Sequence, residues 1–199
     1  MPQRSDEALL EAARHGDRQA FAILVERRQD DVLAFIRRFL GMTGRDAAED
    51  LAQDVFLQVW KAVPRYRAQA KATTWLLRIA TNVCLNQRRG ARLRRTVPLP
   101  AVLEAGGTVA DGEGVGLGEE TRARVREAVA ALPEGQRAVL VLRHFHELPY
   151  SEIADVMDTT VSAVESLLFR ARTALRKRLA GVETEGGPQD LPGSGAERV

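Results

Sequence analysis

The chain has little of what holds small secreted domains or metal centres together. Its 199 residues include a single cysteine, Cys84, so neither an intrachain disulfide nor a cysteine-based zinc site can be assembled. Cys84 falls near the apolar side of a predicted helix, which suits a small core residue. No apolar run approaches the roughly 20 residues that a membrane span needs. The first residues lead into charged helical sequence rather than a signal-peptide core, and we therefore expect a cytoplasmic protein with no membrane insertion.

The signatures of enzymes and cofactor-binding proteins are also missing from the sequence. It contains no glycine-rich phosphate loop, no nucleophile elbow and no evident pair of catalytic carboxylates. His144, His146 and Glu147 are close in sequence, but their spacing does not converge on one helical face, and His15 is the only other histidine. The sequence therefore predicts neither an enzyme nor a protein that needs a metal ion or another cofactor.

Strand patterns of useful length are absent, and apolar residues recur instead at helical spacing. Helix starts are marked by capping residues, namely Ser5 or Asp6, Thr73 or Thr74, and Ser151. We therefore predict an all-α protein. The first expected helix begins at the Ser5 or Asp6 cap and is broken at 15–18. The others cover residues 19–40, 47–63, a stretch beginning at 75, 119–132, 136–144, 151–157 and 161–179.

The charge of the chain is small but unevenly distributed. The formal net charge is +2, yet residues 88–95 hold five arginines in eight positions, whereas residues 96–121 contain no lysine or arginine. Such a basic block favours a polyanionic partner. The stretch that follows it is rich in glycine and acidic residues and carries two prolines, as linkers do. We predict two small helical domains, residues 1–95 and 121–180, joined by a flexible linker, 96–120, and followed by a disordered tail, 181–199.

The helix that begins at Trp75 combines side chains that suit a nucleic acid. Its core face is predicted to hold Leu76, Ile79, Ala80 and Val83. The opposite face carries guanidinium, carboxamide and aromatic groups, which suit phosphates, base edges and stacked bases. Its members are Arg78, Thr81, Asn82, Leu85 and Arg89, with Trp75 and Asn86 at the edge. We interpret this helix as one that reads a nucleic acid.

A helix earlier in the chain, residues 47–63, has an unusual exposed face. Its broad core face lies opposite a stripe formed by Asp50, Gln53, Asp54 and Leu57. This stripe can be an ordinary solvated face with one stray leucine. It can also be a docking surface for a basic partner helix, and spacing alone leaves both interpretations open.

The spacing of residues 151–179 is typical of a helix-turn-helix. A short helix from Ser151 is followed by a three-residue turn and a longer helix. The inward side of the longer helix is predicted to hold Val161, Val164, Leu168, Ala171, Leu175 and Leu179. The outward side would approach DNA, with Ser151 offering backbone amides to a phosphate. Those outward residues are Ser162, Ala163, Ser166, Arg170, Thr173 and Lys177. Two ordinary packed helices with a solvated basic face would give the same pattern.

Several of these segments together resemble the extracytoplasmic-function group of sigma factors, in the sigma-70 family of bacterial RNA polymerase. The resemblance covers roughly residues 8–180. It is carried by residues 48–60 (AEDLAQDVFLQVW), 74–86 (TWLLRIATNVCLN), 132–143 (LPEGQRAVLVLR), 150–154 (YSEIA) and 163–172 (AVESLLFRAR).

The resemblance implies a role for each candidate surface. The stripe formed by Asp50, Gln53, Asp54 and Leu57 would dock on the clamp coiled coil of core RNA polymerase. The Trp75 helix would open and read the promoter −10 element, and the helix-turn-helix would read the −35 element. The −10 residues would be Lys71, Trp75, Arg78, Asn82, Asn86, Arg88 and Arg89, with the loop 67–73 receiving a flipped base and residues 88–95 holding phosphates.

The chain departs from many relatives at two positions of the last helix. Glu165 and Leu167 stand where relatives often carry basic residues, so base contacts cannot be copied across from the family. Glu165 could accept from a cytosine amine or pair with Arg172 or Arg176. We also expect Leu85 to act as a wedge or as the wall of a base pocket.

Partners follow from the resemblance as well. They are core RNA polymerase, promoter DNA and an anti-sigma factor, of which the last is implied by the family only. The main competing hypothesis is a free-standing helix-turn-helix regulator that binds duplex DNA alone, usually as a dimer. A weaker one is an RNA-binding adaptor that uses the arginine block.

Overall fold

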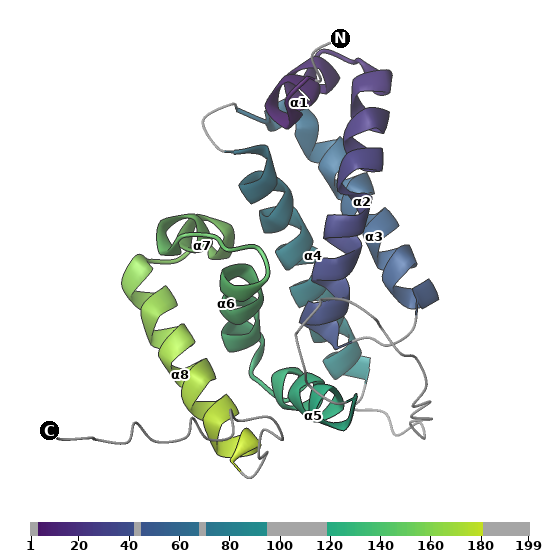
Figure 1. The fold of residues 1–199 in the computed structure, drawn as a ribbon. Coiled ribbons are helices and arrows are strands. Elements are labelled where there is room, and N and C mark those ends of the chain that lie inside the picture. Colours follow the sequence, from purple (N-terminus) through teal and green to yellow (C-terminus); the bar gives the residue numbers. More distant parts are fainter. Residues whose placement is uncertain (1–3, 42–44, 68–70, 95–118, 181–199) are drawn as a thin grey trace, which may run out of the picture.

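The structure is a computed structural model that describes residues 4–41, 45–67, 71–94 and 119–180, with the backbone alone at 45, 46, 88–94 and 119. Within these ranges the chain is helical and contains no strand, so the predicted all-α fold is confirmed (Figure 1). The elements are α1 (Asp6–Arg14), α2 (Arg18–Leu40), α3 (Arg45–Ala62), a 3-10 turn η1 (Val63–Arg65), α4 (Ala72–Arg94), α5 (Glu119–Ala130), α6 (Glu134–His144), α7 (Tyr150–Met157) and α8 (Val161–Leu179). Most of the predicted linker and all of the predicted tail lie outside the described residues.

The first four helices form a bundle. In Figure 1, α2, α3 and α4 run beside one another and α1 lies across one end. Leu10, Leu24, Phe35 and Val55 are fully buried where these helices meet. Burial of apolar stripes that recur at helical spacing is therefore the main force that assembles this unit.

None of the helices in the described ranges combines the length and the apolar character that crossing a membrane requires.

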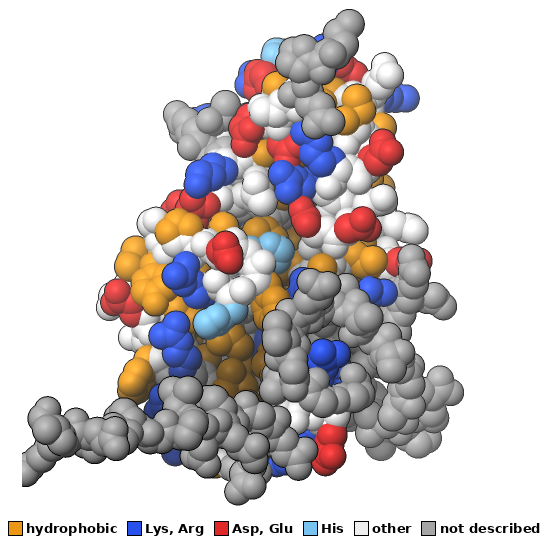
Figure 2. All heavy atoms as spheres, viewed as in Figure 1, with side chains coloured by type: hydrophobic (Ala, Val, Ile, Leu, Met, Phe, Trp, Pro, Cys, Tyr) orange, Lys and Arg blue, Asp and Glu red, His pale blue; other side chains and the backbone are white. Residues whose placement is uncertain are grey.

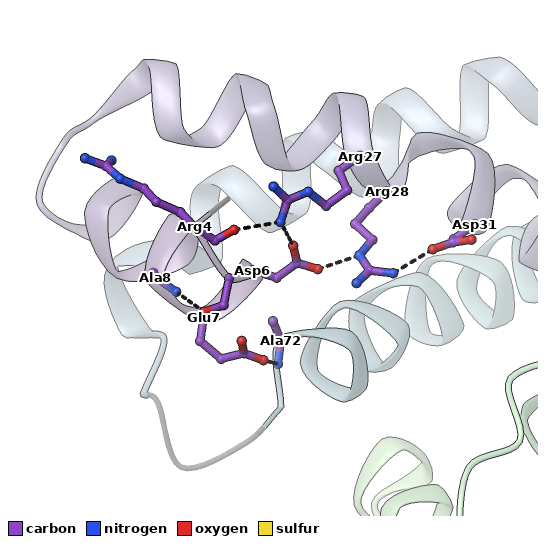
Figure 3. Close-up of polar contacts among 9 residues, drawn as sticks. Arg4, Asp6, Glu7, Ala8, Arg27, Arg28, Asp31 and Ala72 are labelled. Carbon is purple, nitrogen blue, oxygen red and sulfur yellow. Dashed lines mark hydrogen bonds and ion pairs between the residues drawn. The ribbon is translucent and has the colours of Figure 1, made fainter. Parts of the chain in front are cut away.

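Two acidic residues of α1 tie the bundle together (Figure 3). Asp6 is almost buried and accepts from Arg27 at 2.6 Å and from Arg28 at 2.5 Å. Glu7 accepts from the backbone N–H of Ala72 at 3.1 Å, and this bond lowers the pKa of the Glu7 carboxyl. The predicted cap at Thr73 or Thr74 was therefore wrong. Helix α4 begins at Ala72, three residues before the predicted start at Trp75. Its first turn receives a carboxylate from another helix, which also suits the positive end of the helix dipole.

The last four helices form the second unit. Its core includes Val139, Ile153, Val164 and Leu168, which are buried from α6, α7 and α8. The turn between α7 and α8 includes Asp158 in the left-handed conformation, at φ 52°. Its last residue, Thr160, accepts from the N–H of Ala163 and caps α8. The short helix, turn and long helix occur as the spacing predicted.

Three details of this unit correct the sequence analysis. Ser151 is not a cap, because α7 begins at Tyr150 and its N-cap position is Pro149. Val161 was predicted to point inward but is 42% exposed. It is the first residue of α8, and burial along this helix begins only at Val164. Leu175 and Leu179 are only half-buried, since the buried stripe of α8 ends at Ala171.

The two units pack against each other. Helices α4 and α7 are neighbours, as are α2 and α6, and the apolar residues of both units form one continuous cluster (Figure 1). Arg137 of α6 is completely buried and donates to the backbone carbonyls of Phe39, at 2.9 Å, Leu132, at 2.8 Å, and Ala130. A Cβ on Gly41 would lie 3.0 Å from that of Ala130, so the end of α2 touches α5. The structure therefore places the second unit on the face of the bundle formed by α2 and α4.

His146 makes this packing sensitive to acid. Its ring lies 5.5 Å from that of Phe35, and its pKa is lowered by burial and, to a smaller extent, by Arg38, while Asp31 acts in the opposite direction. A histidine whose folded pKa is depressed stabilises the fold at high pH and loses that contribution as pH falls below the usual value of 6.5.

We expect the urea concentration at the midpoint of unfolding to drop between pH 7.5 and 5.5. His146→Gln should reduce that drop and the exposed His15→Gln should not. An unchanged slope in His146→Gln would contradict the assignment.

Candidate nucleic-acid and partner interfaces

The acidic stripe of α3 is exposed, as predicted. Asp50, Gln53 and Asp54 are all accessible, and Leu57 is 55% exposed, whereas Val55 on the other side of the helix is fully buried. An exposed leucine among carboxylates leaves apolar area in contact with water beside negative charge. This combination suits a partner that brings both an apolar contact and basic side chains.

A groove of about 630 Å³ runs beside this stripe, between α2 and α3. Phe21 and Trp60 form part of its wall, with ring centroids 4.8 Å apart. Its other walls come from Val25, Gln29, Asp30, Leu33, Glu49, Ala52, Gln53, Phe56 and Leu57. The groove could not be predicted from the sequence, because its two sides belong to different helices. It extends the stripe into a concave surface with apolar walls and an acidic rim.

The reading face of α4 is only partly free. Arg78, Asn82 and Asn86 are exposed, as expected for residues that contact a nucleic acid. Thr81 was placed on the same face but is 1% exposed, and its hydroxyl has no partner among the described residues. Thr81 lies two helical turns after Thr74, whose hydroxyl bonds to Glu152 of α7, so both residues fall on the same side of α4. The assignment was wrong because a sequence pattern cannot show a second packing partner. The backbone of Arg88 and Arg89 continues α4, but their side chains lie outside the described part of the chain.

Trp75 and Leu85 are half-buried rather than projecting. The Trp75 ring packs edge-on against that of Tyr66, with centroids 5.1 Å apart, and both Trp75 and Leu85 pack against the core. Tyr66 is 1% exposed, so Trp75 packs against a buried ring. Trp75 keeps part of its surface accessible, because it is half-buried.

Polar groups at the start of α4 contact acidic groups of the second unit. Lys71 Nζ lies 2.6 Å from Glu152 Oε1, and the Thr74 hydroxyl donates to Glu152 Oε2, also at 2.6 Å. Farther along, Arg78 lies 3.4 Å from Asp158. The hydrogen bond from Lys71, followed by that from Thr74, lowers the pKa of the Glu152 carboxyl. Two predicted −10 residues, Lys71 and Arg78, are therefore paired within the chain.

The outward face of α8 carries the residues that were predicted for it. Ser162, Ser166, Arg170 and Lys177 are exposed, and Ala163 and Thr173 are half-buried. Figure 2 shows basic and apolar side chains interleaved over this part of the molecule. Ser151 is exposed in the first turn of α7. A face of small and basic side chains next to a free helix start suits entry into a major groove.

Phe169 is the functional candidate that the sequence analysis missed. It is 72% exposed on α8. At about 100° per residue, Phe169 lies on the same face of this helix as Ser162, Ser166 and Thr173. An exposed aromatic ring on a groove-facing helix can contact a thymine methyl group. Phe169 was not predicted because the DNA-facing residues of this helix were selected for small or polar side chains, and phenylalanine is apolar.

Comparisons with known proteins place the chain in a family. The model of sigma-70 region 2 matches residues 24–94, and that of sigma-70 region 4 matches residues 122–175. The RNA polymerase sigma-H factor of Pseudomonas aeruginosa is 35% identical over 90% of this chain and 96% of its own length. The ECF RNA polymerase sigma-E factor of Escherichia coli is 32% identical over 89% of this chain and 95% of its own.

Solved structures show the same fold. CnrH, in complex with the cytosolic domain of CnrY, has a TM-score of 0.66 and 26% identity, and the match covers 90% of this chain and 100% of that one. The sigma factor RpoE of Bartonella quintana, in complex with the anti-sigma factor NepR, has a TM-score of 0.62 at 20% identity, over 82% of this chain and 98% of that one. With two family models in the expected order and relatives matched over nearly their whole length, the chain belongs to the extracytoplasmic-function group of the sigma-70 family.

Proposed function

We propose that this chain binds core RNA polymerase and directs it to promoters through two DNA-reading surfaces, and that it has no catalytic activity of its own. The observation that carries the proposal is the coexistence, in one chain of this family, of the exposed stripe on α3 and the two polar faces on α4 and α8. A regulator that binds duplex DNA alone would have no use for the stripe. Because core polymerase and promoters are cytoplasmic in bacteria, we place the protein in the cytoplasm.

The stripe formed by Asp50, Gln53, Asp54 and Leu57 is proposed to dock on the clamp coiled coil of polymerase. The groove between α2 and α3 adds an apolar wall to this stripe, and its rim carries Asp30 and Glu49. A basic amphipathic helix fits such a surface because its apolar residues enter the groove while its cations meet the carboxylates. Charge complementarity also speeds encounter and fixes the register of docking.

The −10 element is proposed to be read by α4 and the loop before it. Asn82 and Asn86 expose carboxamides that can pair with base edges, and Lys71, Arg78, Arg88 and Arg89 provide cations for the backbone. The half-buried ring of Trp75 provides an edge or face against which an unpaired base can stack. Capture of unpaired bases stabilises the open strands because the closed duplex cannot make the same contacts.

The −35 element is proposed to be read by α8. Ser162, Ala163, Ser166 and Phe169 occupy its first turns, and Arg170, Thr173 and Lys177 follow along the same face. Ser151 and the start of α7 would hold a phosphate. This is the arrangement in which the first turns of a recognition helix approach base edges while basic residues farther on meet the backbone.

An anti-sigma factor is proposed as a further partner. CnrH was solved in complex with the cytosolic domain of CnrY, and the sigma factor RpoE of Bartonella quintana in complex with the anti-sigma factor NepR. The groove between α2 and α3 is the surface of this chain best suited to such a partner, since it offers apolar area next to negative charge. A partner bound there would compete directly with polymerase.

Replacement of Arg170 tests the −35 assignment. Arg170→Ala should weaken binding of holoenzyme to −35 duplex by about 1 to 3 kcal/mol if its guanidinium reaches a base, and should relax specificity at that position. Lys177→Ala is the matched comparison, because loss of a phosphate contact weakens binding about equally for all sequences and lowers the salt dependence. Affinities over a set of single-base −35 variants, measured by fluorescence anisotropy, would distinguish the two. Uniform weakening in Arg170→Ala would reduce its role to a backbone contact.

The proposal as a whole is tested by DNA footprinting with and without core polymerase. The chain should protect −10 and −35 sites together only when polymerase is present, because the two elements must be held at a fixed spacing. Tight, sequence-specific protection of duplex DNA by the chain alone, with no change on addition of polymerase, would favour the free-standing regulator instead.

A further inference from the structure

Helix α8 carries a single acidic residue. Glu165 is the only aspartate or glutamate among residues 161–179, which also include four arginines and one lysine. Its side chain is exposed in the second turn of the helix, next to Ser166 and one turn before Phe169. A carboxylate on a helix that faces DNA is repelled by the phosphates. Glu165 therefore weakens the approach of α8 to DNA unless it gains a contact that offsets this repulsion.

Helical spacing gives Glu165 no cation of its own. Side chains on one helix meet at separations of three and four residues. The residues at those separations from Glu165 are Val161, Ser162, Leu168 and Phe169. Because none of them is basic, α8 cannot neutralise this carboxylate with the usual ion pair between neighbouring turns.

The two arginines on the same side of α8 are farther away. Arg172 follows Glu165 by two turns and Arg176 by three, which at 1.5 Å per residue is about 10 Å and about 16 Å along the axis. The pKa of His144 in α6 is lowered by burial and, to smaller extents, by Arg172 and Arg143, so the Arg172 guanidinium lies within electrostatic reach of α6. In the part of the chain that the structure describes, no hydrogen bond or ion pair joins Glu165 to another side chain. Its carboxylate is free to accept from a partner outside the chain.

The position of Glu165 around the helix brings it to the edge of the DNA-facing side. At about 100° per residue, it lies about 40° from Phe169 and about 60° from Ser162, both of which are exposed. Leu168, about 60° away on the other side, is buried in the core. Glu165 also belongs to the first two turns of α8, which is the part of a recognition helix that approaches base edges.

The chemistry of the major groove limits what a carboxylate can bind there. An ionised carboxylate only accepts hydrogen bonds, and the exposed donors in this groove are the amino groups of cytosine and adenine. The adenine amine stands beside the N7 acceptor, which would face the second carboxylate oxygen, and a carboxamide matches that pair of groups better. The cytosine amine has no acceptor beside it on the same base. Cytosine is therefore the base that suits Glu165.

We propose that Glu165 makes α8 selective for cytosine at one position of the −35 element, by accepting from the N4 amine of that base. The proposal deepens, and rests on, the proposed reading of the −35 element by α8. It divides the work of the helix between two kinds of residue. The arginines and the lysine attract any DNA, whereas Glu165 penalises every base that leaves its carboxylate desolvated and without a donor.

The test measures base preferences of the holoenzyme assembled with the full-length chain. A promoter that this holoenzyme transcribes is randomised over its −35 element with the −10 element kept constant, and the bound DNA is sequenced to give relative affinities at each position. The variants are Glu165→Ala and Glu165→Gln. Asp155→Asn is the control, because it removes an exposed carboxylate from α7 of the same unit.

The wild type should prefer cytosine at one −35 position by about tenfold over the other bases. Glu165→Ala should reduce this preference below about twofold at that position alone, and Glu165→Gln should shift it toward adenine, which a carboxamide matches. Asp155→Asn should reproduce the wild-type preferences.

Unchanged preferences in both Glu165 variants would overturn the proposal. So would equal tightening on all sequences, since Glu165 would then act only by repelling the backbone. In either case, continued discrimination at the other −35 positions would leave the proposed function intact. A wild-type holoenzyme without base preference anywhere in the −35 region would instead contradict the reading of this element by α8.

Discussion

Asp54→Arg is expected to abolish binding to core RNA polymerase while leaving the fold intact. Asp54 is exposed on α3, between Asp50 and Leu57 of the proposed docking stripe, and it makes no core contact that its replacement would disturb. Reversal of its charge replaces an attraction to a basic helix with a repulsion. Like-charge juxtaposition across an interface costs several kcal/mol, so the affinity should fall by about 100-fold or more.

The matched control is Asp155→Arg, which makes the same change of charge at an exposed position of α7. Binding is best followed by fluorescence anisotropy of labelled chain against purified core polymerase, with thermal unfolding as the check on folding. The control should bind within about twofold of the wild type. Normal holoenzyme formation by Asp54→Arg would show that the docking surface lies elsewhere.

Arg137→Ala is expected to produce the largest loss of stability. Its guanidinium is completely buried and donates to three backbone carbonyls, from Phe39 of one unit and from Ala130 and Leu132 of the other. Truncation would leave these carbonyls without their donor and open a cavity of the size of a long side chain. Buried groups left unsatisfied cost about 1 to 3 kcal/mol, and we expect a total of about 3 kcal/mol or more.

Urea unfolding measures this loss directly. Arg124→Ala, an exposed arginine of α5, is the control and should remain within about 0.5 kcal/mol of the wild type. Arg137 joins the two units, so its loss should also lower the cooperativity of unfolding. A change below about 1 kcal/mol, with a single unaltered transition, would mean that the two units do not depend on this contact.

Much of the helical framework could be predicted because it depends on local patterns. The bounds of α8 agree with the predicted residues 161–179, and Ser5 caps α1 through a hydrogen bond to Ala8. Gly41 ends α2 in the left-handed conformation, as a glycine just after the last apolar residue of a helix commonly does. Helix caps, terminal glycines and apolar spacing act over a few residues, so a single sequence is enough to recognise them.

Long-range contacts could not be predicted in the same way. Glu7 caps α4 from 65 residues away, and Arg137 reaches the end of α2 across 98 residues. Nothing local marks either residue, since an ordinary surface glutamate or arginine would look the same. The burial of Thr81 was missed for the same reason, because it depends on packing that a sequence pattern does not show.

The exposed faces of single helices were predicted more completely than the surfaces and contacts that two helices or two units form together. All four residues of the α3 stripe are exposed, and so are most of those predicted for α8. The groove beside the stripe was missed because it needs two helices, and the pairing of Lys71 with Glu152 because it needs two units. Sequence patterns assign faces to helices, whereas packing determines which faces remain free.

The most direct test of the account is run-off transcription with purified core polymerase and a library of promoters. We expect specific transcripts that require both the chain and core polymerase, that disappear with Asp54→Arg, and that share −10 and −35 sequences at a constant spacing. Absence of any transcript that depends on both components, together with tight binding of the chain alone to duplex DNA, would contradict it.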